Sequence, residues 1–99
     1  MATKSAKKFV VVRTYSAGCF AGYLESHKGQ EVKLSKAIRL WMWNGAASLS
    51  QLAQEGTSKP TECKFPPAVD EIELTQAIEI ISTTAKAKAS IEGVTPWRA

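Results

Sequence analysis

The order of hydrophobic and polar residues along the first third of the chain predicts a β-hairpin. "KFVVVRTY", residues 8–15, is rich in β-branched residues, which is typical of a strand, and "CFAGYLES" follows after a glycine. We expect the turn at Ala17–Gly18, with a positive φ at Gly18. With a two-residue loop Arg13 would face Gly22, whereas a three-residue loop shifts the register and removes this pairing.

Two segments later in the chain resemble each other. "EVKLSKAIRLW" (31–41) and "EIELTQAIEII" (71–81) align without a gap, with four identical positions and three conservative ones. We interpret them as an internal strand–corner–strand–helix repeat, with tight corners at Ser35–Lys36 and at Thr75–Gln76. The alternative is a chance resemblance between two amphipathic strands.

A helical pattern follows each of these segments. In "SLSQLAQEG" the residues Leu49, Leu52 and Ala53 have the spacing of one apolar helix face, and Ser48 with Gln51 fits a capping box. Gly56 is expected to end this helix. In "TTAKAKASIEG" we expect a second short helix, with the cap, inward-facing and final residues at Thr83 or Thr84, Ala87, Ile91 and Gly93.

Together these elements predict the fold class α+β: an antiparallel sheet of about five or six strands with two short helices. Lys64–Phe65 is a candidate edge strand, because Pro66–Pro67 keeps that segment out of a central ladder. We expect a flexible basic tail over residues 1–8 and a single α+β domain over residues 9–99.

Charge is concentrated at the start of the chain. The net charge is +4 over 99 residues, and three of the thirteen basic residues, Lys4, Lys7 and Lys8, lie in the first eight positions. The remaining ten basic residues are balanced by nine acidic ones, so nucleic-acid binding would rest on the tail and ranks behind other functions. No apolar run approaches the ~20 residues of a membrane helix, and no secretion signal is evident, which favours a cytoplasmic protein.

Candidate catalytic and metal-binding residues are few. Cys19 and Cys63 lack the paired spacing of a zinc site and are expected to be free thiols, and His27 is the single histidine. The chain has no nucleophile motif and no paired carboxylates in an apolar setting. We therefore expect neither an enzyme nor a cofactor or metal.

The most informative stretch is "AIRLWMW", Ala37–Trp43, which is expected to form a strand. Alternation would direct Ile38, Leu40 and Met42 to the core and Arg39, Trp41 and Trp43 to the opposite face. Such a face suits core packing under another element, an oligomer or partner interface, or a ligand pocket. An acid beside Arg39 would favour the core, and its repeat equivalent, Glu79, is the candidate.

A second candidate cluster lies beside the predicted glycine turn. Arg13, Tyr15 and Ser16 in "RTYSAG" are placed where backbone N–H groups can hold an anion, although the chain has no "GxxxxGK" phosphate loop. The alternative is an ordinary hairpin turn.

The succession "VVRTYSAG", "LWMWNGAASLSQLA", "ECKFP" and "LTQAIEII" resembles a family of small proteins of tailed bacteriophages and prophages, known as a domain of unknown function. The resemblance covers about Phe9 to Trp97. Family members often carry a second basic residue where this chain has Ile38. The resemblance implies a phage origin and action in the cytoplasm of the infected host, and it supplies no catalytic or binding residues.

These observations lead to four functional hypotheses. The first is a non-enzymatic phage accessory protein that forms a homo-oligomer and binds a host or defence protein through Arg39, Trp41 and Trp43. The second is a module that sequesters a nucleotide or a nucleotide-like signal with Arg13, Tyr15, Arg39 and Trp41. The third is nucleic-acid binding through the basic tail, and the last is a virion component.

Overall fold

Five antiparallel strands and two short helices make up the domain, which confirms the predicted α+β class. The structure, a computed structural model, describes residues 7–98. In chain order the elements are β1 (Phe9–Thr14), β2 (Cys19–Lys28), β3 (Glu31–Arg39), α1 (Leu49–Glu55), the 3-10 turn η2 (Pro60–Glu62), β4 (Val69–Leu74), β5 (Ala77–Ser82) and α2 (Ala85–Glu92).

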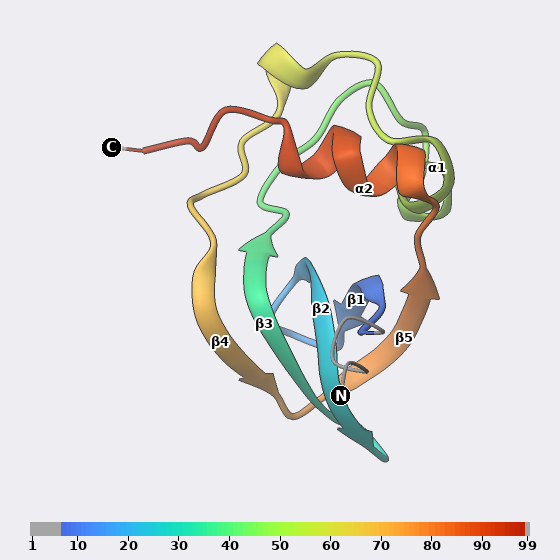
Figure 1. Cartoon of the computed structure of the whole chain (residues 1–99), viewed down its shortest axis with the longest axis vertical. Helices are drawn as coiled ribbons and strands as arrows, with labels where there is room; N and C mark the ends of the chain where they lie inside the picture. Colours follow the sequence, from blue (N-terminus) through green and yellow to red (C-terminus); the bar gives the residue numbers. More distant parts are fainter. Residues whose placement is uncertain (1–6, 99) are drawn as a thin grey trace.

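The sheet is strongly curled. Its strand order is β4-β3-β2-β1-β5, so β4 and β5 lie at opposite edges although Thr75–Gln76 alone separates them in the chain. Figure 1 shows these two strands on the left and right of the molecule, converging at the bottom. Backbone hydrogen bonds from Ala77 N to Gln30 O (3.0 Å) and from Tyr15 N to Gln76 O (2.9 Å) hold the connection against its neighbours. The sheet is therefore a partly open barrel.

Both faces of the sheet are buried, and β1 supplies residues to each. One apolar cluster contains residues of all five strands, among them Val10, Val12 and Phe20, and fills the inside of the curl. The other joins Phe9 and Val11 to the two helices. Because four consecutive residues of β1 are buried, its sequence is continuously apolar rather than alternating.

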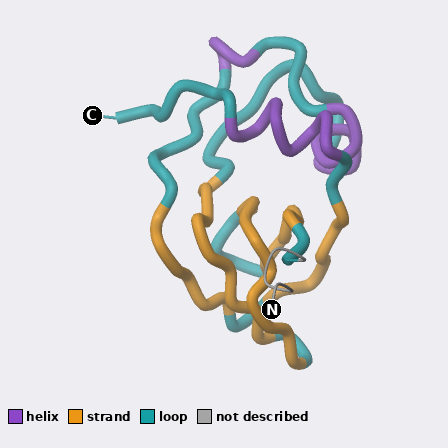
Figure 2. Tube along the Cα trace, viewed as in Figure 1, coloured by secondary structure: helices purple, strands orange, loops and turns teal. Residues whose placement is uncertain are grey.

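The helices begin and end at the residues that the sequence predicts. Ser48 caps α1 by accepting a hydrogen bond from Gln51 N, and Gly56 follows the helix with φ +79°. Thr84 caps α2 in the same way through Ala87 N. Figure 2 shows both helices and their connecting loops gathered at one end of the molecule, beyond the strands. Together they cover the β1 and β5 side of the sheet, where Leu52 and Ile91 are buried.

One of the two predicted strand corners was wrong. Ser35–Lys36 is not a corner, because β3 runs through it and Lys36 is accommodated as a bulge with φ +49°. The Thr75–Gln76 corner is confirmed, so the two similar segments do not fold alike. Arg13 faces Cys19 rather than Gly22, because the β1–β2 loop is longer than two residues.

Gly22 makes room for the bulge in β3. Between the pairs Ala21↔Ile38 and Tyr23↔Ser35, β3 has one residue more than β2. A Cβ atom at Gly22 would lie 3.0 Å from Ser35 O and 3.1 Å from the Ala37 Cα. Bulges increase local twist and bend a strand, so this close approach contributes to the curl.

A second irregularity in the β2–β3 ladder is a bulge in β2 at Glu25. Glu25 is the extra residue between Leu24↔Leu34 and Ser26↔Lys33. Its carboxylate accepts hydrogen bonds from Lys7 Nζ and Ser35 Oγ, and these bonds hold the pKa of Glu25 below its usual value.

The predicted basic tail, residues 1–8, is described in part. Residues 1–6 lie outside the described residues, and the backbone oxygen of Lys8 accepts a hydrogen bond from Leu24 N.

Replacing Gly22 by valine tests whether the bulge needs a glycine. We expect Gly22→Val to lower the free energy of unfolding by roughly 1–3 kcal/mol, because overpacking against backbone atoms outweighs the strand preference of valine. Ser26→Val, at an exposed position of the same strand, is the matched control and should change stability by less than about 0.5 kcal/mol. Urea titrations measure both, and equal midpoints for the two variants would contradict the proposed packing.

Candidate binding surface

The regular strand stops before the two tryptophans. β3 ends at Arg39, and pairing resumes at an isolated bridge between Met42 and Lys64. This bridge keeps the register of the β3–β4 ladder. Pro66 and Pro67 lie between the two paired regions and have no backbone N–H to donate, so the ladder is interrupted there. The prediction of a strand through Trp43 was therefore partly wrong.

Arg39 is held in place from two sides. Its guanidinium carbon lies 4.5 Å from the centroid of the Phe20 ring, a cation–π arrangement. Its Nη1 donates a hydrogen bond to Ala17 O in the β1–β2 turn, at 3.0 Å. Although Arg39 is exposed, its planar group is therefore fixed over the mouth of the apolar interior of the sheet.

Trp41 and Trp43 have different environments. The Trp41 side chain is 64% exposed. Trp43 is partly buried and packs against the cluster beneath the helices, together with Leu40. The predicted alternation therefore breaks after Leu40, and Trp43 does not share the surface of Arg39 and Trp41. Tryptophan and arginine are the residue types most enriched in binding hot spots, and Arg39 and Trp41, two positions apart in the chain, are both exposed.

Arg13 does not belong to this surface. Arg13 pairs with Cys19, and Arg39 pairs with Phe20, so the two arginines lie on opposite faces of the sheet. Arg13 forms an ion pair with Glu79, at 3.0 Å from Nε to Oε1. The predicted Arg39–Glu79 pair was thus wrong, because β5 lies beside β1 and not beside β3. Both partners are about half exposed, so the pair contributes at most about 1 kcal/mol.

The β1–β2 turn presents one further aromatic residue. Gly18 has φ +98°, as predicted, and Tyr15 is 77% exposed. Ser16 Oγ donates to the Gln76 side chain at 2.8 Å, and Thr14 Oγ1 donates to Gly18 O at the same distance. Hydrogen bonds within the protein therefore use the hydroxyl groups of Thr14 and Ser16 and hold the turn in an ordered conformation.

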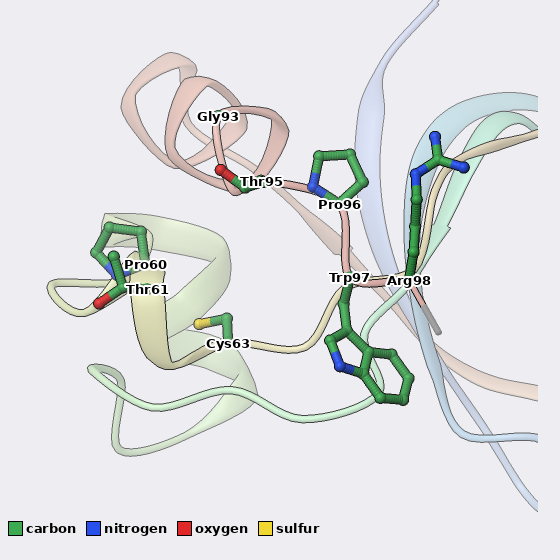
Figure 3. Close-up of a pocket in the computed structure, with 8 residues that line it drawn as sticks. All are labelled: Pro60, Thr61, Cys63, Gly93, Thr95, Pro96, Trp97 and Arg98. Carbon is green, nitrogen blue, oxygen red and sulfur yellow. The ribbon is translucent and has the colours of Figure 1, made fainter.

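A separate cavity lies between η2 and the segment after α2. It has a volume of about 540 Å³ and is lined by Thr61, Cys63, Thr95, Trp97, Arg98 and neighbouring backbone. Figure 3 shows the Cys63 sulfur turned toward η2 and away from Trp97, and the Arg98 side chain pointing away from Cys63. The Cys63 thiol lies 3.6 Å from Asn44 O and is buried. The cavity thus offers hydroxyl and apolar contacts but no charged group directed inward.

Both cysteines are free thiols. Cys19 is half-buried beside Arg13, and burial raises the pKa of its thiol, which Arg13 partly offsets. Among residues 7–98, no three histidine, cysteine or acidic side chains come together as metal ligands. In the same part of the chain, no helix has the length and apolar character needed to cross a membrane.

Sequence reasoning missed a small apolar socket beside Arg39. Phe20, Ala37 and Ile72 form its floor, and Pro66 with Pro67 forms one wall. From the sequence, the two prolines indicate only that Lys64–Phe65 does not belong to a central ladder. Their place opposite the end of β3 follows from the β3–β4 register, which the local sequence does not reveal.

Sequence reasoning also missed a row of exposed residues that continues from Trp41. Met42 pairs with Lys64, and Lys64 Nζ lies 5.5 Å from the centroid of the Trp97 ring. Trp97 in turn donates its backbone N–H to Phe65 O, at 2.9 Å. Three segments distant in the chain therefore lie side by side at the upper left of Figure 1.

Fold and surface together define a small α+β domain whose exposed aromatic and cationic side chains are held on a curled sheet. The chain belongs to the family described as Domain of unknown function (DUF6948), whose model matches residues 7–91. Searches of curated proteins and of solved structures each gave no match.

The different roles of the two adjacent tryptophans can be separated by substitution. Trp41→Ala should change the free energy of unfolding by less than about 0.5 kcal/mol, because its indole is mostly in water. Trp43→Ala should lower it by roughly 2–3 kcal/mol, because it leaves a gap against the cluster beneath the helices. Thermal and urea unfolding measure both changes, and a Trp41→Ala variant that unfolds more readily than Trp43→Ala would reverse the assignment.

Proposed function

We propose that this chain is a non-enzymatic interaction protein that binds a partner protein through the surface formed by Arg39 and Trp41. The proposal rests on one observation: the Trp41 side chain is 64% exposed, although the residues before and after it both form backbone hydrogen bonds. Leu40 N donates to Cys19 O, and Met42 N donates to Lys64 O. The indole is thus presented from an ordered backbone, so binding loses little conformational entropy.

The energy available from this residue is sufficient for a hot spot. Covering its exposed area, roughly 150 Å², would contribute about 4 kcal/mol, before the costs of association. Measured hot-spot residues lose at least about 2 kcal/mol on truncation to alanine, a loss of roughly thirty-fold in affinity. Arg39, two positions before Trp41 and fixed by Phe20 and Ala17 O, would add a charged donor to the proposed surface.

The resemblance of the sequence to tailed-phage and prophage proteins gives the biological setting of the proposal. The partner would be a host or defence protein in the cytoplasm of the infected cell, and the phage protein would act as a homo-oligomer.

Nucleotide binding is the second candidate, favoured by one observation. The 540 Å³ cavity beside Trp97 lies within the range of ~300–1,000 Å³ typical of small-molecule sites. Calorimetry with a panel of nucleotides, including cyclic ones, tests it. Binding that is lost in Trp97→Ala and retained in Trp41→Ala would support this cavity as the site, and silence across the panel would reject it.

Affinity capture from infected cells tests the main proposal. The tagged wild-type protein should retain a partner that Trp41→Ala loses by at least about thirty-fold in titration. Ile78→Ala, which removes an apolar side chain of 45% exposure on the far edge strand, is the matched control and should retain it. Sedimentation of the same variants reports self-association. Equal capture by all three folded proteins would show that Trp41 does not mediate binding.

A further inference from the structure

A socket of side-chain size opens directly beside Arg39. Its volume is about 80 Å³, and its floor consists of Phe20, Ala37 and Ile72 from the interior of the sheet. Val69, which is 47% exposed, stands at the rim. Small-molecule sites have volumes of ~300–1,000 Å³, so this socket holds one apolar side chain and is too small for a nucleotide.

Arg39 gives the rim of the socket an unbalanced positive charge. A guanidinium has five N–H donors, and one hydrogen bond, to Ala17 O, is formed within the protein. The ion pairs among residues 7–98 use Lys7, Arg13 and Lys88 as cations, so none involves Arg39. The residues that line the socket include no acid. The remaining donors of Arg39 are therefore complementary to a carboxylate that arrives with a partner.

We propose that the partner presents an extended segment in which an apolar residue stands next to an acidic one. The apolar side chain enters the socket, the carboxylate pairs with Arg39, and Trp41 covers the following residue. This inference rests on the proposed protein-binding function and names the chemistry of its partner. The segment cannot continue along β4, because Asp70, Glu71 and Glu73 are exposed there and would repel its acidic residues.

A ligand of the socket must supply both an anion for Arg39 and an apolar group for the floor. A phosphate-bearing ligand would satisfy Arg39 but leave the floor of Phe20 and Ile72 in water. An apolar peptide without an acid would fill the socket but bury the side of a guanidinium without an anion. A segment with both features satisfies both sites at once, and a five-residue peptide is long enough to carry them.

Nuclear magnetic resonance titration of the full chain with capped pentapeptides tests this inference. The test peptide has the order glycine, aspartate, leucine, aspartate, glycine. One control replaces both aspartates by asparagine, and the other replaces leucine by serine. We expect chemical-shift changes at the Arg39 amide and the Trp41 indole, and at least a ten-fold weaker binding of each control. Equal binding of the test and control peptides, or no binding of any, would overturn the proposal.

Substitutions at the rim locate the binding. Val69→Asp places a carboxylate beside Arg39 within the chain and should weaken binding of the test peptide at least ten-fold, as should Arg39→Gln. Ile78→Asp makes the same change at a position of similar exposure on β5, and should leave binding within two-fold. If Ile78→Asp weakened peptide binding as much as Val69→Asp, the added negative charge would account for the loss and the socket would not be the binding site.

The two proposals fail in different ways. If partner capture is lost in Trp41→Ala but unaffected by Val69→Asp and Arg39→Gln, the protein-binding function stands and the socket is not its anchor. Adenosine monophosphate provides a further test. If it causes larger chemical-shift changes at Arg39 than the test peptide does, the ligand is a flat anion and the proposed partner segment is rejected.

Discussion

The two-residue connection between β4 and β5 is the constraint on which the rest of the structure depends. Strands at opposite edges of a five-stranded sheet can be joined so briefly only if the sheet closes on itself. Leu74 and Ala77, on either side of the connection, are buried in the same cluster, so apolar packing stabilises the closure. The curl then requires sharp irregularities in the longer strands, and these occur at the bulges opposite Gly22 and at Glu25.

The curl also creates the proposed binding surface. Phe20, Ala37 and Ile72 belong to three neighbouring strands, and their side chains converge at the mouth of the curled sheet. Pro66 and Pro67 interrupt the ladder at this point, so no backbone hydrogen bonds draw β4 against the end of β3. The socket is thus the space left where a ladder would otherwise close, and Arg39 is fixed across it by contacts with Phe20 and with the β1–β2 turn.

Local signals in the sequence predicted the local structure well. The caps at Ser48 and Thr84 and the turn at Gly18 depend on side chains and backbone within a few residues, and all three were confirmed. The strand order was not predictable in this way, because it depends on pairing between distant segments. The likeness of residues 31–41 and 71–81 suggested similar units, yet the first holds a bulge and the second a turn between opposite edges.

The candidate site shows the same division between local and distant information. Alternation predicted the exposed Arg39 and Trp41, but Trp43 turned toward the helices, since the strand pattern lapses after the interrupted ladder. The bridge of Met42 to Lys64 explains why Trp41 nonetheless keeps an ordered position in water. Burial of an indole is favourable wherever it is possible, so the one indole that stays mostly exposed on a paired backbone is the feature that the packing of this domain does not explain. The proposed partner would cover this indole and so account for its position.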